Sequence, residues 1–337
     1  MKENFNKIIN WISKKSWLFF LAWILLPIAF YKHNYIMHVL IMIAIYTILS
    51  QGLNLVMGFC GQSQLGFAAF FGIGAYVTGL LITLLGWSFW ITLPLAFVGS
   101  ALMGYVIGLP STRVRGDYLG IVTLGFGEIT RIILTNWDSL TNGPMGISGI
   151  KPPSLFGFNL GSKVIFFYMV TLLTGITWFI MNRLVNSKFG FQLMAVRNDE
   201  NVAEVLGIKT GKVKVTAYAL SSGVAGIAGA IYASYFSFIS PDSFIFNDSL
   251  AILCMVVVGG MGNLTGSAIG AILLTIAPEL FRFLGDYRML LYGVILTVMV
   301  IFKPMGIWGL NKRKRNVIID TCGNKVNLLK NRKELKI

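Results

Sequence analysis

The sequence predicts an all-α, polytopic membrane protein with about ten transmembrane segments. Of its 337 residues, 55% are hydrophobic and only 12% are charged, whereas a soluble globular domain carries about 25% charged residues. The mean hydropathy is +0.73. Apolar stretches recur along the chain, and several reach the roughly 20 residues that a helix needs to cross ~30 Å of hydrocarbon. These observations indicate lipid rather than water as the solvent.

One long apolar stretch has to be divided to give ten segments. The stretches cover residues 16–31, 35–58, 64–85, 89–109, 117–135, 164–182, 215–236, 249–278 and 289–303. Residues 249–278 would form a helix of about 45 Å, too long for one ordinary crossing. Glycines at 259, 260 and 262 interrupt it, and glycine is a poor helix-interior residue. A full crossing by 249–258 and a half-helix that dips in and returns both remain open.

The net charge of +15 is distributed as expected for a membrane surface rather than for a nucleic-acid partner. Four lysines precede the first apolar stretch, six basic residues lie in 183–214 and nine lie in the tail. Basic residues concentrate on the cytoplasmic side of the membrane. The prediction is a cytoplasmic segment 1–15, a transmembrane domain 16–303 with a cytoplasmic loop 183–214, and a basic cytoplasmic tail 304–337 that faces anionic lipid. An even number of crossings then places both ends inside.

Uncharged polar side chains form the first group of candidate functional residues. Those embedded among glycines are Gln51, Asn54, Gln62, Ser63 and Gln64, and Asn263 lies in the interrupted stretch. Amides inside a membrane must find partners, so they face other helices or a wet cavity. They are candidates for lining a translocation path. Close helix–helix packing with amides bonded across it explains the same pattern equally well.

Glu128 and Arg131 form a second candidate group, spaced to pair on one face of a membrane helix. An ion-coupled secondary transporter would use such charges in its path. A structural ion pair near the membrane edge is the favoured alternative, because an unpaired charge at mid-bilayer costs ~2.5–3.5 kcal/mol on insertion scales.

The cytoplasmic loop contains a third candidate element. Residues 192–206 suit a short amphipathic helix, and Gly207 is a plausible stop. Its apolar side would consist of Leu193, Val196, Val202, Val205 and Leu206. A solvent-exposed helix of this kind has to bury its apolar stripe. A partner protein and the membrane surface are the two candidates for covering it.

Catalytic, cofactor and metal motifs are not recognisable in the sequence. Cys60, Cys254 and Cys322 are scattered singly, so they are expected to be packing residues. The two histidines have no acidic or cysteine neighbours with ligand spacing. The chain is therefore not expected to be an enzyme or to bind a metal or cofactor. If transport is driven by ATP, another subunit must hydrolyse it.

Five blocks of sequence resemble a known family. They are GLNLVMGFCGQSQLGFAAFFGIGAY (52–76), TRVRGDYLGIVTLGFGEITR (112–131), LTNGPMGISGI (140–150), the stretch 189–214 and VVVGGMGNLTGSAIGA (256–271). In identity, order and spacing they resemble the branched-chain amino acid ABC importer permeases of the LivM type. The resemblance spans residues 52–309, most of the chain.

This resemblance implies half of a translocation path in the bacterial plasma membrane. The implied partners are a second, LivH-type permease, two ATP-binding subunits that use ATP and Mg²⁺, and an extracytoplasmic substrate-binding protein. It also implies that the 192–207 helix couples to an ATPase. The implied coupling residues are Arg197, Asn198, Asp199, Glu200, Ala203 and Gly207. Only Ala203 and Gly207 match the Glu-Ala-Ala…Gly motif of such permeases strictly.

Two alternative activities and one test follow from the resemblance. A close relative of the family would move urea, short amides or nucleosides, and a secondary transporter would use Glu128 and Arg131 without ATP. The outward loop 136–163 is where the binding protein is expected to dock. Deleting residues 145–150 should then abolish uptake without affecting assembly.

Overall fold

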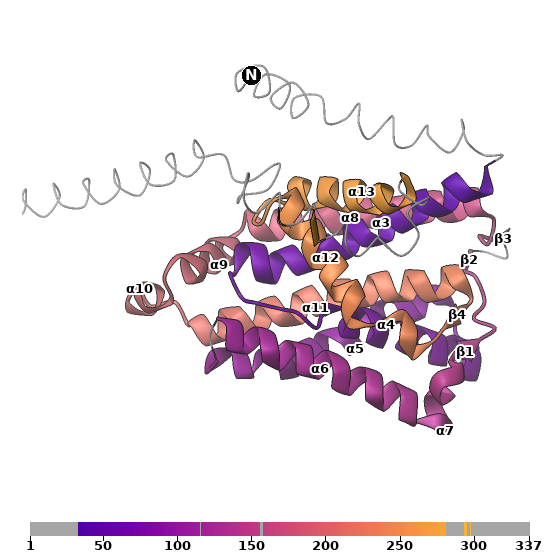
Figure 1. Cartoon of the computed structure of the whole chain (residues 1–337), viewed down its shortest axis with the longest axis horizontal. Coiled ribbons are helices and arrows are strands. Elements are labelled where there is room, and N and C mark those ends of the chain that lie inside the picture. Colours follow the sequence, from indigo (N-terminus) through magenta and orange to yellow (C-terminus); the bar gives the residue numbers. More distant parts are fainter. Residues whose placement is uncertain (1–32, 115, 156–157, 281–292, 295–296, 298–337) are drawn as a thin grey trace, which may run out of the picture.

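The computed structural model describes residues 33–114, 116–155, 158–280, 293–294 and 297, and Figure 1 shows their arrangement. The predicted first segment 16–31, most of 289–303 and the ends 1–15 and 304–337 lie outside the described residues. Cys60 and Cys254 are both buried, as expected for packing residues, and Cys322 lies outside this part.

The described residues form a bundle of long apolar helices. The longer helices are α3 (Asn34–Asn54), α4 (Phe67–Leu85), α5 (Phe89–Gly108), α6 (Asp117–Asn136), α8 (Lys163–Val185), α11 (Thr210–Phe236), α12 (Phe246–Gly259) and α13 (Leu264–Leu280). A π-helical turn, η1 (Leu55–Phe59), continues α3. Among the described residues, seven helical stretches are long and apolar enough to span a membrane, and α13 is a shorter apolar helix. A multi-pass helical membrane protein is thus confirmed, while the count of ten stays a prediction.

Short elements connect these helices. They are α7 (Asp138–Thr141), α9 (Lys188–Asn198), α10 (Glu200–Val205), the 3₁₀ turns η2 (Pro110–Thr112), η3 (Gly143–Met145) and η4 (Pro241–Ser243), and the strands β1 (Ile147–Ser148), β2 (Ser154–Leu155), β3 (Phe158–Asn159) and β4 (Phe238–Ile239). Strands β1 and β4 pair antiparallel, as do β2 and β3. In the described part of the chain, the regular structure is therefore helical except for these two-residue strands.

The predicted break in 249–278 is present, and it lies between α12 and α13. Gly260 and Gly262 both have positive φ, 124° and 82°, in the turn between the helices. Such backbone conformations favour glycine. The first half begins earlier than residue 249: η4 and α12 together give a 19-residue stretch, Pro241–Gly259, long enough to cross. That length favours a full crossing over a half-helix.

Helix α11 is the centre of the bundle and packs against α3, α4 and α5. Small residues bring the backbones together. A Cβ on Gly226 would lie 2.4 Å from the carbonyl oxygen of Ala96, and one on Gly104 would lie 2.3 Å from Oγ of Ser222. Close approach through small residues is the main way in which membrane helices pack, since lipid supplies no hydrophobic force between them.

The two ends of the bundle differ in structure. Helices α9 and α10 lie at one end, on the left in Figure 1, and the strands and α7 lie at the other. The loops predicted to be cytoplasmic meet at the α9–α10 end: Arg197 contacts Gly58, and Lys214 contacts Ser111. The loops predicted to be external meet at the strand end, where β1 pairs with β4. The described helices thus alternate in direction as expected.

The β1–β4 strand pair shows that deleting residues 145–150 is not a clean test of binding-protein docking. Ile147 and Ile150 are 8% and 1% exposed, and their side chains pack near Gly79 of α4 together with Ile239. Removing residues 145–150 would delete β1 and open this part of the core. The deletion would therefore damage folding, and point substitutions at exposed positions of the loop are the cleaner test.

Candidate functional site

Asn54 joins the end of α3 to the break between α12 and α13. Its Nδ2 donates to the carbonyl oxygen of Asn263 at 2.9 Å, and its Oδ1 accepts from the backbone N–H of Gly262 at 2.8 Å. Asn54 is fully buried. The Asn263 side chain caps α13, accepting from Thr265 Oγ1 at 2.7 Å and from its N–H at 3.2 Å. Two of the predicted path residues therefore meet here, in a structural contact.

Gly58 is required for this contact. A Cβ at that position would lie 1.7 Å from Oδ1 of Asn54 and 2.4 Å from the backbone nitrogen of Gly262. Gly58 lies in the π-helical turn η1, and single π turns inside α-helices occur frequently at functional sites. The glycine-rich pattern thus has a specific cause here, which is the close approach of η1 to the break between α12 and α13, with the Asn54 amide between them.

The remaining predicted amides are less well partnered. Gln51 and Gln64 are each 1% exposed. In the described part of the chain, Oε1 of Gln51 and both amide atoms of Gln64 have no hydrogen-bond partner. A buried unpartnered polar group costs roughly 1–3 kcal/mol, so water or a solute is the expected partner. Gln62 and Ser63 are partly exposed beside them, and the Ser63 carbonyl accepts from the Tyr218 hydroxyl at 3.0 Å.

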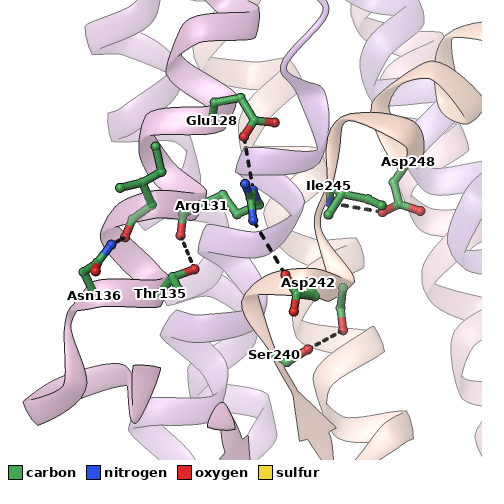
Figure 2. Close-up of polar contacts among 10 residues, drawn as sticks. Glu128, Arg131, Thr135, Asn136, Ser240, Asp242, Ile245 and Asp248 are labelled. Carbon is green, nitrogen blue, oxygen red and sulfur yellow. Dashed lines mark hydrogen bonds and ion pairs between the residues drawn. The ribbon is translucent and has the colours of Figure 1, made fainter. Parts of the chain in front are cut away.

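Glu128 and Arg131 pair as their spacing predicts, and a third residue joins them. Nε of Arg131 lies 3.1 Å from Oε2 of Glu128, and Nη1 lies 3.7 Å from Oδ1 of Asp242. Figure 2 shows this chain of charges running from α6 to the turn before α12, at the strand end of the bundle. The side chains are 38%, 34% and 77% exposed. The arrangement is an ion pair joined by a third charge at the strand end of the bundle, and its place at the membrane edge stays a prediction.

The loop 183–214, which is predicted to be cytoplasmic, departs from the expected single helix over 192–206. It forms two helices, α9 and α10, which are interrupted at Asp199. Asp199 has an extended backbone, and its Oδ1 accepts from the N–H groups of Asn201 and Val202 at 2.9 and 3.1 Å. This is an N-cap, the position that aspartate favours. Asp199 is therefore a capping residue of α10.

Arg197 points from α9 toward the transmembrane bundle. Its guanidinium donates to the carbonyl oxygen of Gly58. Its Cγ packs against Gly61 so closely that a Cβ added to Gly61 would lie 2.8 Å from it. Gly61 has φ of 71°, so glycine serves there for both its conformation and its lack of a side chain. Desolvation lowers the pKa of Arg197, although a guanidinium stays charged at neutral pH. Helix α9 is thus tied to the end of α3.

A second contact ties α10 to α11. Lys214 is fully buried, and its Nζ lies 2.6 Å from Oε1 of Glu200 and donates to the carbonyl oxygen of Ser111 at 3.2 Å. The Thr210 hydroxyl donates to Oε1 of Glu204 at 2.6 Å. A buried charge requires both an ion partner and further hydrogen bonds, and this lysine has both.

Some of the residues predicted for coupling or for the apolar side of the loop helix pack against the bundle, and others are exposed. Leu193, Val196 and Ala203 are buried against the bundle. In contrast, Val202, Val205 and Leu206 are 53%, 88% and 73% exposed. Asn198 is also exposed, and Gly207 ends the element with φ of 83°. The structure therefore leaves an apolar tip on α10, composed of Val202, Val205 and Leu206, with no cover in the described part of the chain.

Three residues of these sites escape prediction from the sequence. Lys214 resembles an ordinary basic loop residue, Ser111 contributes only a carbonyl oxygen, and Asp242 lies more than a hundred residues from Arg131. The available signal for Lys214 is its place at the start of an apolar helix, where a lysine needs a partner. Nothing local identifies the other two.

Comparison with known proteins identifies relatives along most of the chain. Residues 35–302 match the family described as branched-chain amino acid transport system / permease component. A Salmonella typhimurium protein named high-affinity branched-chain amino acid transport system permease protein LivM is 39% identical over 324 residues, covering 89% of this chain and 76% of the relative. The Escherichia coli protein of that name is 38% identical over the same shares.

More distant relatives include a second kind of permease. A Salmonella typhimurium protein named high-affinity branched-chain amino acid transport system permease protein LivH is 25% identical over 285 residues, covering 78% of this chain and 91% of the relative. No solved structure matches the chain significantly. The family match covers the described helical bundle and includes every candidate residue discussed above. This chain belongs to the family of branched-chain amino acid transport system permease components.

Proposed function

We propose that this chain is the membrane-spanning permease subunit of an ATP-driven importer for the branched-chain amino acids leucine, isoleucine and valine. The observation that carries the proposal is the similarity to the LivM permeases over 89% of the chain. Permease subunits of this kind are not enzymes. In this proposal the chain binds no cofactor, and ATP and Mg²⁺ are used by two partner ATP-binding subunits.

The proposed orientation places the α9–α10 end in the cytoplasm of a bacterial cell, together with 1–15 and the tail 304–337. Its support is the basic character of the loop 183–214, which carries six lysine and arginine residues. The strand end then faces outward, toward an extracytoplasmic substrate-binding protein. Met145 is 77% exposed at that end and is a candidate docking residue.

In the proposed mechanism, the apolar tip of α10 docks on an ATP-binding subunit. Closure of the two ATP-binding subunits displaces α9 and α10 together. The displacement reaches the bundle at the two contacts described above, Arg197 with Gly58 and Glu200 with Lys214. The Arg197–Gly58 contact connects α9 to η1, beside the Asn54 contact. The Glu200–Lys214 contact connects α10 to the inner ends of α5 and α11. Motion of these ends alternately opens the path inward and outward.

The other activities are less well supported. Transport of urea, amides or nucleosides has no support in the names of the relatives reported above, which are branched-chain amino acid permeases. Proton-coupled transport would need a side chain that changes its ionisation in the path, and sodium-coupled transport would need a carboxylate free to bind the cation. Arg131 instead lies between two carboxylates near the outer edge, which fits a fixed ion pair.

The test is uptake into proteoliposomes that contain this chain, the LivH-type permease and both ATP-binding subunits, with labelled leucine, valine, urea and a nucleoside. Uptake of leucine or valine only with internal ATP and added binding protein is the expected result. Gradient-driven uptake by this chain alone, abolished by proton or sodium ionophores, would overturn the proposal. Uptake of urea or nucleoside in place of leucine would overturn the assignment of the solute.

A further inference from the structure

Three helices of the described bundle, α5, α6 and α8, leave the largest shares of their surfaces uncovered. The uncovered faces of α5 and α8 are apolar. They present Ile91, Leu102 and Val106 on α5 and Leu172, Phe179 and Ile180 on α8, all between 51% and 64% exposed. Such faces suit direct contact with lipid, because their exposed side chains are mainly hydrocarbon.

Helix α6 differs, because its uncovered face contains ions. Ile121, Gly125, Glu128 and Ile132 follow one another at steps of four, three and four residues, which places them on one stripe of the helix. We refer to these four residues as the α6 stripe. Ile121 and Ile132 are 65% and 52% exposed, and the Glu128 side chain is 38% exposed. Arg131 lies beside the stripe and carries a further charge, 34% exposed.

Lipid is a poor cover for this stripe. Charged side chains within membrane spans face other helices or a water-filled cavity, because hydrocarbon does not solvate them. Asp242, which contacts Arg131, and Asn247 are both exposed near the start of the α12 stretch. Figure 2 shows Asp242 beside Arg131, whereas Asp248 lies farther along the chain and accepts from the backbone N–H of Ile245. A polar strip thus continues from α6 onto the outer end of α12.

We infer that the α6 stripe is the surface on which the second permease subunit packs, and that the Glu128–Arg131–Asp242 charges line the outer half of the path between the two subunits. The inference rests on the proposed function. The LivH relatives match 78% of this chain, so two permeases of common fold would pair through corresponding faces. Gly125 supports close contact, since a Cβ there would meet nothing within 4 Å and small residues are preferred where membrane helices touch.

Photocrosslinking in the complete transporter tests this surface. The photoreactive amino acid p-benzoylphenylalanine replaces Ile121 or Ile132 on the stripe, and Ile91 on α5 or Ile180 on α8 as controls. The four positions have similar exposure, 52% to 65%. Ile121 and Ile180 lie toward the α9–α10 end, whereas Ile132 and Ile91 lie toward the strand end, so depth is matched. The complex is purified with the LivH-type permease and both ATP-binding subunits, irradiated and separated by mass.

The expected result is a covalent adduct with the LivH-type permease from positions 121 and 132 and none from positions 91 and 180. Adducts with a second copy of this chain, within this chain, or with the binding protein would overturn the choice of partner. Adducts from positions 91 or 180 alone would overturn the choice of face. ATP-dependent leucine uptake is measured on the same preparations. Leucine uptake without the expected adducts would contradict only the assignment of the α6 stripe to this interface. The expected adducts without any leucine uptake would contradict the proposed transport function.

Discussion

Single polar side chains join the elements of this permease where they approach most closely. Asn54 bonds two backbone groups in the break between α12 and α13, and Lys214 bonds a carboxylate and a carbonyl oxygen at the end of α11. Both are fully buried. Each can be tested by removing one group while its surroundings stay intact.

Gly58→Ala should destabilise the subunit and lower uptake. The added methyl would overlap Oδ1 of Asn54 at 1.7 Å and the nitrogen of Gly262 at 2.4 Å, and overpacking of this kind costs about 1–3 kcal/mol. Gly99→Ala is the control, because a Cβ there meets only a methyl of Val77, at 3.3 Å. The measurements are the thermal unfolding midpoint in detergent and leucine uptake. Equal midpoints for the two variants would contradict this account.

Glu200→Gln should be strongly destabilising. It removes the negative charge beside the buried Lys214 ammonium and leaves only uncharged oxygen acceptors there, and breaking a buried pair by removing one partner costs about 3–5 kcal/mol. The double variant Glu200→Gln/Lys214→Met should recover much of the loss, because it removes the unpaired charge. The thermal midpoints of the single and double variants are compared. A double variant no more stable than the single one would show that the charge is not the cause.

At the scale of elements, the sequence predicts the helices well and their junctions poorly. Hydropathy locates α3, α4, α5, α6, α8 and α11, and the glycine cluster locates the break after Gly259, because these signals depend on local composition. The sequence does not reveal the interruption at Asp199, since residues 192–206 have a continuous helical pattern of apolar side chains. The structure shows why: Leu193 and Val196 pack inward, whereas Val202 and Val205 point outward. One apolar stripe thus serves two different surfaces.

In the candidate sites too, the sequence predicts contacts within one helix but not contacts between helices. The spacing of Glu128 and Arg131 predicts their pairing, since both lie on one helix. Asn54 and Asn263 are both identifiable as polar residues in apolar segments, but their contact links positions more than two hundred residues apart. Such a contact depends on how α3 packs against α12 and α13. Only the tertiary arrangement determines that packing.

Asp199→Ala tests the junction between α9 and α10. Loss of the N-cap, which accepts from Asn201 and Val202, costs about 1 kcal/mol and should fray the start of α10. Uptake is expected to fall several-fold, while the thermal midpoint of the subunit changes little. Asp199→Ser is the control, since serine also caps helices. If the alanine and serine variants transport equally well, the cap has no part in coupling.

At the scale of the whole molecule, the two ends of the bundle should have separable partners. Val205 is 88% exposed on the apolar tip of α10. Val205→Asp should greatly reduce co-purification of the ATP-binding subunits, because a carboxylate would have to be buried in that interface. Binding of the substrate-binding protein to the permease pair should not change. Normal recovery of the ATP-binding subunits would contradict docking at this tip.

Met145→Asp is the reciprocal variant. Met145 is 77% exposed at the strand end, where the binding protein is expected to dock, and its replacement leaves the β1–β4 pair and the buried Ile147 in place. The affinity for the binding protein should fall several-fold, whereas co-purification of the ATP-binding subunits should be normal. The affinity is measured by titrating labelled binding protein onto the reconstituted complex. An unchanged affinity would place the docking surface elsewhere on the loop.

The β1–β4 pair also has a mechanical consequence. At the strand end, backbone hydrogen bonds fasten the loop that follows α6 to the link between α11 and α12. At the α9–α10 end, the contacts described above pass through side chains. We therefore expect the helices to pivot about the β1–β4 strand pair. A push on α10 should swing the inner ends of α5 and α11 through the largest arc, while the outer rim stays nearly still.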